Sequence, residues 1–423
     1  MTPFVKKIIA AFLLSGAVLS ACSVYPHSLL DPVEDGAGGG GKDAGGAGGG
    51  KANAPGYGRG FWSGPNADGC FSVKAPTPQQ RPQRSSSEQL PAIYLAIDSL
   101  ILGAENPQGV KDGNAWQGYG LDLDGTCTGS PTCPGSEDTP PVQTCAAKTP
   151  KVPVDGNDCR DNTFGKLESG VADTTIGKTY HLTDDSFNCG LCLGRFTFII
   201  KISRYNGEAA DGDVRVDLYA SPGLEQPIAF QCDTDWRSTL YDKGFCWQNN
   251  QPFLVEQSSM DEPTAGPELS NAKIFDDSAY VRDGYLVMAM PPATRLWFPH
   301  TVSSPIYTFP FVLGGGVTVG KLTRLPDTTW TVEDGLIAGW SKGTDLVEGF
   351  ERLGFCEGKD PLYPFMKTLV ANNLDLLSSG GNNPAQSCDA ISVGIPFKAR
   401  QATVGGLINT PFPERCAPNV PPK

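Results

Sequence analysis

The stretch Arg195-Phe-Thr-Phe-Ile-Ile-Lys-Ile202, followed by Asn206-Gly207 and by Asp213-Val-Arg-Val-Asp-Leu-Tyr219, decides the fold class of this chain. Every second residue from Phe196 to Ile202 is apolar, so these side chains share one face of an extended strand. Asn-Gly favours a tight turn between strands, and the second stretch alternates in the same way as the first. Together the three features predict two antiparallel strands joined by a turn.

Other parts of the chain repeat this pattern of short alternating stretches. Further strands are expected at 93–102, 285–290, 306–313, 316–322 and 391–397. Two helices are expected within about 344–378, where apolar residues recur at helical spacing. Short strands without a regular strand–helix–strand rhythm predict a mainly β fold, a sandwich or jelly-roll-like domain with a short helical insertion near the C-terminus.

The N-terminus has the features of a bacterial export signal. Two lysines precede an apolar stretch, Ile8 to Val18, which is too short for a stable membrane-spanning helix. Leu19-Ser-Ala-Cys22 then resembles a lipobox, and this resemblance implies a lipid on Cys22. The alternative is an ordinary signal peptide with a chance cysteine. Ser23, which stands where an inner-membrane retention signal has Asp, favours the outer membrane.

Composition divides the rest of the chain into a tether and a folded part. We expect a signal peptide at 1–21, a Gly-rich flexible tether at 22–59, and a single disulfide-braced β-rich domain at 60–423. The net charge is −13, and removal of the signal peptide with its two lysines makes it −15. An acidic surface disfavours nucleic acid, whereas it suits divalent cations and cationic partners.

The cysteine count predicts disulfides. Once Cys22 is assigned to lipid, 12 of the 13 cysteines remain, and an even set in an exported protein indicates disulfides. Proximity in the sequence suggests the pairs Cys127–Cys133, Cys145–Cys159, Cys232–Cys246 and Cys356–Cys388. Cys189-Gly-Leu-Cys192 has CxxC spacing but is followed at once by strand sequence, so structural disulfides are expected there as well.

An acidic segment offers the best candidate for a metal site, and the metal would be calcium. Its carboxylates are Asp122, Asp124, Asp155, Asp158 and Asp161. Calcium takes six to eight oxygen ligands, and loops of this composition can supply them. The alternative is that these residues simply form turns in a loop held by disulfides.

Tryptophans raise the possibility of a glycan site. Trp116 lies beside the acidic segment, and Trp236 and Trp247 flank the expected Cys232–Cys246 loop. Flat aromatic rings can pack against sugar rings, although tryptophan in a large β domain is ordinarily a packing residue. The sequence contains no motif of a serine hydrolase, zinc protease or P-loop enzyme.

Several loose motifs add a resemblance to a known group. The lipobox, the Gly-rich tether and motifs at 118–127, 161–165, 279–281, 333–339 and 388–395 resemble secreted lipoproteins of myxobacteria and their relatives. The resemblance implies a location in the cell envelope and no particular activity. We therefore expect a non-enzymatic protein that binds an envelope component, such as another envelope protein, or an extracellular ligand. Two alternatives remain open: a glycan-binding or glycoside-hydrolase-like module of lectin type, and a purely structural envelope protein.

Overall fold

The computed structural model describes residues 57, 59–66, 69–84, 86–130, 132–133, 144–148, 153–172, 174, 177, 183–232, 236–262, 269–300, 307–410 and 416. Contacts divide the chain into two units, Met1–Ala52 and Asn53–Lys423, and all the described residues belong to the second. The proposed signal peptide, Cys22 and nearly all of the proposed tether therefore lie outside the described residues. Within the described part of the chain, no helix is long and apolar enough to cross a membrane.

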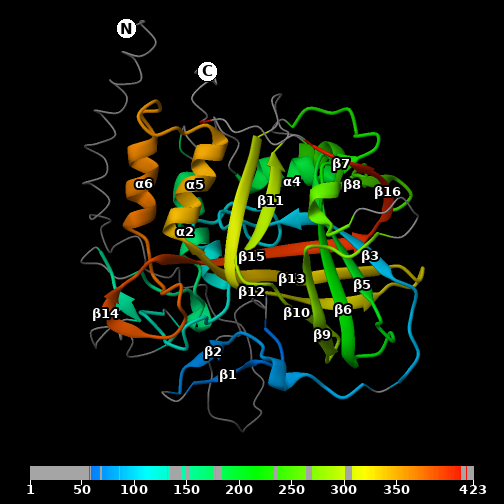
Figure 1. Ribbon diagram of the computed structural model, residues 1–423, viewed down its shortest axis with the longest axis horizontal. Helices are drawn as coiled ribbons and strands as arrows, with labels where there is room; N and C mark the ends of the chain where they lie inside the picture. The colour runs from blue at the N-terminus through cyan, green and yellow to red at the C-terminus, as the bar shows by residue number, and fades with distance from the viewer. Residues whose placement is uncertain are drawn as a thin grey trace, which may run out of the picture. The chain divides into compact units, whose positions relative to one another are not determined.

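The fold is mainly β, as predicted, and is built around one large antiparallel sheet (Figure 1). The strands run in the order β10-β9-β6-β5-β3-β15-β13-β12-β11. Because β10 pairs with both β9 and β12, all of these strands except β11 form a closed ring. The predicted sandwich or jelly roll is thus not confirmed. In sequence order the strands of this sheet are β3 (Ile93–Leu100), β5 (Thr197–Ser203), β6 (Ala210–Ser221), β9 (Ile274–Arg282), β10 (Tyr285–Ala289), β11 (Thr294–His300), β12 (Tyr307–Arg324), β13 (Trp330–Lys342) and β15 (Ala390–Gln401).

The predicted hairpin forms the pair β5 and β6. Ile200 lies opposite Leu218 in its register, and every second side chain from Phe196 to Ile202 belongs to the main hydrophobic core. Ile199, on the other face of β5, is also buried, because a second apolar cluster covers it. Both faces of this strand are therefore packed at its centre, where Phe198, Ile199 and Ile200 follow one another.

Strand β12 corrects one prediction. We expected two strands separated by a turn at Gly314-Gly-Gly316, whereas one continuous strand spans Tyr307–Arg324. Its pairing with β13 shifts between Gly314 and Val317, so the glycines form an irregularity within the strand. A side chain at Gly314 would overlap the ring of Trp340 on the neighbouring strand. The glycines thus make room for this ring instead of reversing the chain.

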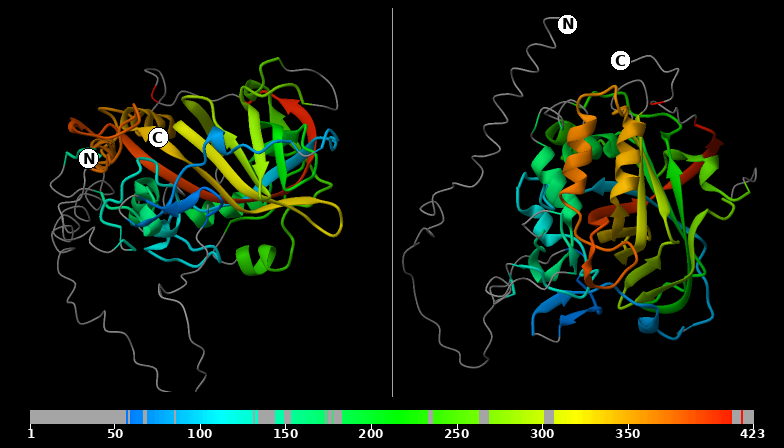
Figure 2. Two further views of the ribbon diagram at one scale, coloured as in Figure 1. Left: turned by 90° about the horizontal axis from the view of Figure 1, so that it is seen from below. Right: turned by 60° about the vertical axis from the view of Figure 1, so that its left-hand side comes forward.

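Helices pack against part of the sheet. The two expected near the C-terminus are α5 (Gly343–Leu353) and α6 (Tyr363–Ala371), which lie side by side (Figure 2). Two more, α2 (Thr163–Val171) and α4 (Asp184–Cys192), were not predicted. Together with β12 and β15 the helices line an apolar cavity of about 980 Å³, the open space at its mouth included.

Short elements surround the main sheet. The hairpin of β1 (Ser63–Pro65) and β2 (Phe71–Val73) packs through Trp62 and Val73 against the outer side of β10, β12 and β13. The remaining strands form two small sheets, β14 (Asn383–Ser387) with β4 (Cys145–Ala146), and β16 (Thr403–Ile408) with β8 (Pro252–Glu256) and β7 (Gly223–Leu224).

All twelve cysteines after Cys22 form disulfides, which confirms the prediction from their even number. The four pairs suggested by proximity are nevertheless wrong. The observed pairs are Cys70–Cys133, Cys127–Cys159, Cys145–Cys388, Cys189–Cys232, Cys192–Cys246 and Cys356–Cys416. Both cysteines of the CxxC motif lie on α4 and bond to partners outside the motif, so the motif is structural.

Candidate metal centre

Backbone pairing brings distant parts of the acidic segment together. The amide of Asp122 donates to the carbonyl of Val73 at the end of β2 (2.7 Å), and the amide of Asp161 donates to the carbonyl of Leu121 (3.0 Å). The chain turns after Asp122, where Gly125 has a left-handed backbone (φ +74°) and its amide donates to Asp122 Oδ1 at 2.6 Å. Asp122 and Asp124 are therefore brought together by this turn.

Three carboxylates meet at this point. Asp122, Asp124 and Asp161 each place one carboxylate oxygen so that the three oxygens lie within 4.8 Å of one another. Calcium binds oxygens at 2.3–2.6 Å, so two oxygens on the same ion can be at most about 5.2 Å apart. The three carboxylates satisfy this geometric requirement. Asp122 and Asp161 are buried, and Asp124 is half-buried.

Burial and mutual repulsion make the carboxylates of this cluster hard to ionise. Burial raises the pKa of Asp124 to about 7, with the charges of Asp122 and Asp375 adding to the effect. Burial and the charge of Asp124 raise the pKa values of Asp155 and Asp161 well above the usual range. No described lysine or arginine forms an ion pair with any of these five carboxylates. Burial and mutual repulsion therefore favour a proton or a bound cation on these carboxylates at neutral pH.

Hydrogen bonds fix the orientation of the ligating groups. Asp122 Oδ2 accepts from the Ser72 hydroxyl, Asp161 Oδ2 accepts from the amide of Leu123 (2.7 Å), and Asp124 Oδ1 accepts from the amide of Thr126 (2.8 Å). An ionised carboxylate can accept about four hydrogen bonds, so each of these groups keeps lone pairs that can bind a cation. The site suits a hard cation bound by oxygen.

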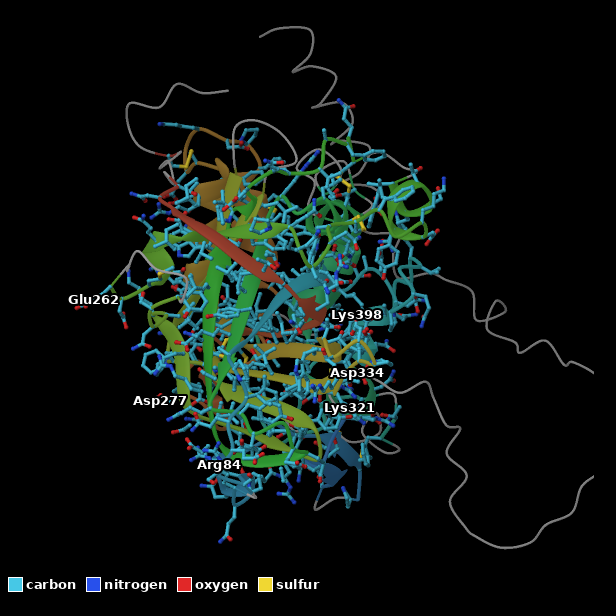
Figure 3. The ribbon with its side chains drawn as sticks, turned by 90° about the vertical axis from the view of Figure 1, so that its right-hand side faces the viewer. Arg84, Glu262, Asp277, Lys321, Asp334 and Lys398 are labelled. Carbon is cyan, nitrogen blue, oxygen red and sulfur yellow. A yellow bond between two sulfur atoms is a disulfide. The ribbon has the colours of Figure 1, made fainter. Side chains whose placement is uncertain are left out.

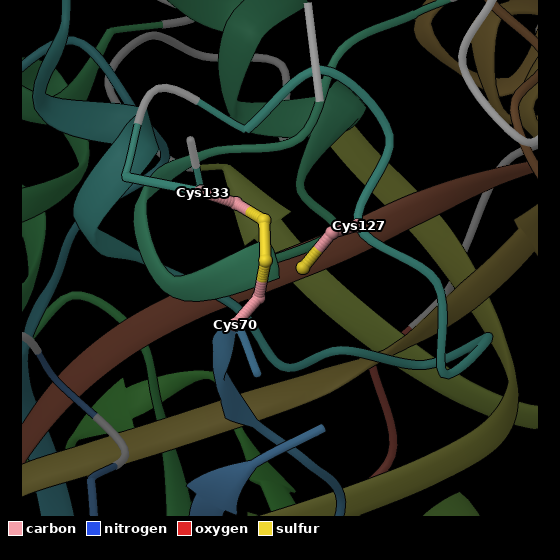
Figure 4. Close-up of side chains that lie close together, drawn as sticks. All are labelled: Cys70, Cys127 and Cys133. Carbon is pink, nitrogen blue, oxygen red and sulfur yellow. A yellow bond between two sulfur atoms is a disulfide. The ribbon is translucent and has the colours of Figure 1, made fainter. Parts of the chain in front are cut away.

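Disulfides hold the loops that carry these residues. Cys127–Cys159 ties the segment after Asp124 to the segment before Asp161, and Cys70–Cys133 ties β2 to the same region. The sulfur of Cys127 lies beside the Cys70–Cys133 bond (Figure 4). The cross-links restrict the separation of the carboxylates in the folded protein.

Not every predicted ligand belongs to the cluster. Asp158 instead forms an ion pair with Arg59, whose Nε donates to Asp158 Oδ2 at 3.1 Å, and lies 3.8 Å from Arg160. A left-handed backbone (φ 59°) at Asp158 accompanies this different orientation. Asp155 is a charged neighbour of the three carboxylates, and the amide of Thr128 donates to it.

Sequence reasoning missed Asp375, which adds a further charge. It is half-buried in the segment between α6 and β14, and it accepts hydrogen bonds from Thr163 Oγ1 (2.6 Å) and the Ser392 amide (2.8 Å). Its charge raises the pKa values of Asp124, Asp155 and Asp161. No local signal marks Asp375, because only the fold brings it near residues more than 200 positions earlier.

The three candidate tryptophans are all buried. Lys166 lies 5.2 Å from the centre of the Trp116 ring. Trp236 donates from Nε1 to Asp185 (2.9 Å), and the guanidinium of Arg400 lies 3.8 Å from the centre of the Trp247 ring. None of these rings presents an open face to solvent, so the predicted stacking of sugars on them is not supported. Trp236 and Trp247 do, however, line two pockets that share Asp98 and Tyr241.

Comparison of the chain with protein-family models, with curated protein sequences and with solved structures finds no match in any of the three.

Proposed function

We propose that this chain is a lipid-anchored protein of the bacterial cell envelope, whose folded region is a calcium-stabilised binding module. The lipobox-like Leu19-Ser-Ala-Cys22 supports an anchor in the outer membrane, and the Gly-rich segment after it supports a tether. Six disulfides agree with an oxidising compartment. The module binds another envelope component or an extracellular ligand without chemical conversion.

The calcium part of this proposal depends on one observation, the convergence of Asp122, Asp124 and Asp161 within 4.8 Å without a paired cation among the described residues. A divalent ion would neutralise the mutual repulsion of these carboxylates and cross-link the turn after Asp122 to the segment before α2. Its role would be structural, because the ion would stabilise the folded state over the unfolded chain, in which the carboxylates are far apart.

A thermal-denaturation experiment tests this part. The full-length chain, purified in detergent, is melted in millimolar calcium and in an excess of chelator. We expect a higher Tm with calcium, and we expect the double variant Asp124→Asn/Asp161→Asn to lose the difference. Asp261→Asn, which changes an exposed carboxylate elsewhere, is the matched control and keeps it. The same Tm with calcium and with chelator would contradict the proposal.

Glycan binding is the second candidate function. It is favoured by the pockets that Trp236 and Trp247 line, because they combine aromatic, acidic and basic side chains at one place.

A further inference from the structure

Two pockets adjoin on the side of the molecule where Lys398 lies (Figure 3). They measure about 580 Å³ and about 600 Å³, the open space at their mouths included, and both are lined by Asp98 and Tyr241. We name the pair the Tyr241 cleft, and its lining includes Asp98, Trp236, Arg237, Tyr241, Trp247 and Arg400. Each of the two pockets is in the size range of small-ligand sites.

An exposed aromatic ring stands between the two pockets. Tyr241 is 51% exposed, and nearby Phe245 is 61% exposed. The buried ring of Trp236 contacts Tyr241 edge-on, with 6.3 Å between the ring centres. Cys189–Cys232 and Cys192–Cys246 bind the two ends of this segment to α4. The cleft therefore presents a flat ring on a cross-linked segment, which lowers the entropy lost when a ligand stacks on it.

The cleft also contains buried polar atoms without hydrogen-bond partners in the described part of the chain. They include Oδ1 of Asp98, an acceptor, and Nε1 of Trp247, a donor. Buried polar groups are nearly always satisfied in folded proteins, so both atoms call for a partner that the described part of the chain does not provide. Both atoms are shielded from solvent, so a ligand contacts the cleft through its exposed groups, above all Tyr241.

The charges of the cleft are already compensated. Arg237 Nη2 lies 2.5 Å from Glu105, Arg400 Nε lies 3.2 Å from Asp98, and Lys398 Nζ lies 3.7 Å from Glu333. An ionic ligand would have to displace one of these partners. Burial raises the pKa of Asp98 to about 6, so Asp98 is still mostly ionised at neutral pH and keeps compensating the charge of Arg400.

We propose that the Tyr241 cleft binds a neutral glycan, with one sugar ring stacked on the exposed ring of Tyr241 and sugar hydroxyls bonded to the half-buried side chains of Asp98 and Arg237. This inference deepens the binding role proposed above and rests on it. It differs from the expectation drawn from the sequence, because the stacking ring is the exposed Tyr241 and not one of the buried tryptophans.

The test uses the full-length chain in detergent with calcium present. An array of neutral and charged oligosaccharides is screened, and the affinity of the best ligand is measured by calorimetry. We expect a neutral oligosaccharide to bind. Tyr241→Ala should lower its affinity about tenfold or more through loss of stacking, and Tyr241→Trp should retain binding. Phe365→Ala removes another exposed aromatic ring, on α6, and is the matched control that leaves binding unchanged.

Two outcomes would overturn the inference: no neutral oligosaccharide binds, or Tyr241→Ala binds as tightly as the unaltered chain. Because Tyr241 is exposed, the alanine variant should keep its Tm, and this measurement separates loss of a contact from loss of the fold. The calcium-dependent Tm of the same samples distinguishes the two proposals. If calcium still raises the Tm although no oligosaccharide binds, only the glycan inference fails.

Discussion

Asp124 and Asp161 are 37 positions apart in the sequence, yet their carboxylate oxygens lie within 4.8 Å of each other. Asp124 lies in the turn after Asp122, and Asp161 precedes Asn162, the N-cap of α2. In an isolated folded protein this proximity is unfavourable, because each charge makes ionisation of the other harder. With a bound divalent cation the same proximity becomes favourable. Removal of one carboxylate should therefore change stability in opposite directions with and without the ion.

Asp161→Asn should have opposite effects on stability with and without calcium. In chelator we expect the variant to be at least as stable as the unaltered chain, because one of the repelling buried carboxylates is gone. In saturating calcium we expect it to be less stable, by about 2–3 kcal/mol if the ion is present at about 100 times its dissociation constant. Urea denaturation in the two conditions measures both differences. Equal destabilisation in both conditions would indicate a purely structural role for Asp161.

Ionisation of Glu105 should lower the stability of the folded protein as the pH rises. Burial raises its pKa to about 7 in the folded protein, against an ordinary value of 4.5. Between these two values the folded state binds more protons than the unfolded chain, so stability is greatest below about pH 4.5 and decreases through about pH 7. The whole change is about 3 kcal/mol or less.

The measurement compares Glu105→Gln with the unaltered chain at about pH 5 and about pH 8, in chelator to remove any effect of calcium. The stability of the unaltered chain relative to the variant should be lower at the higher pH. Glu88→Gln, which alters an exposed glutamate, should show no such trend. A pH-independent difference for Glu105→Gln would disprove the expected proton uptake on folding.

Disulfide mapping can check the tertiary arrangement directly. Mass spectrometry of the non-reduced, digested chain should recover peptides linked by Cys145–Cys388 and no peptide linked by Cys145–Cys159. This bond spans 243 residues, and its loss in Cys145→Ala/Cys388→Ala should cost up to about 5 kcal/mol on the chain-entropy account, less if other disulfides already restrict the unfolded chain. Removal of Cys189–Cys232, with a span of 43 residues, should cost about 1.5 kcal/mol less on the same account.

Lipid attachment to Cys22 is tested by partitioning. The unaltered chain should enter the detergent phase and Cys22→Ser the aqueous phase, because each buried methylene of an acyl chain contributes about 0.8 kcal/mol. Ser23→Ala, which leaves the cysteine intact, is the control. Identical partitioning of the unaltered chain and Cys22→Ser would argue against the anchor.

Local patterns were sufficient to predict a strand where apolar residues alternate along one of its faces. The alternation from Phe196 to Ile202 and the pair Asn206-Gly207 predicted β5, β6 and their connection, because strand periodicity is a property of neighbouring residues. The α4 helix was missed although Thr183 provides an N-cap that accepts from the Ser186 amide (3.2 Å). Gly190 and the two cysteines near its end weaken the helical pattern, and tertiary packing outweighs this weak propensity.

The sequence by itself thus determined the mainly β class, the helical excursion near the C-terminus and the presence of disulfides. These follow from periodicity and from an even cysteine count, neither of which needs knowledge of distant contacts. Only the tertiary structure decided the closure of the sheet through β10 and β12, the cysteine partners, the approach of Asp375 to Asp161 and the exposure of Tyr241. Each of these depends on which distant segments pack together, and that is fixed by the total burial and hydrogen bonding of the folded chain, which no local pattern encodes.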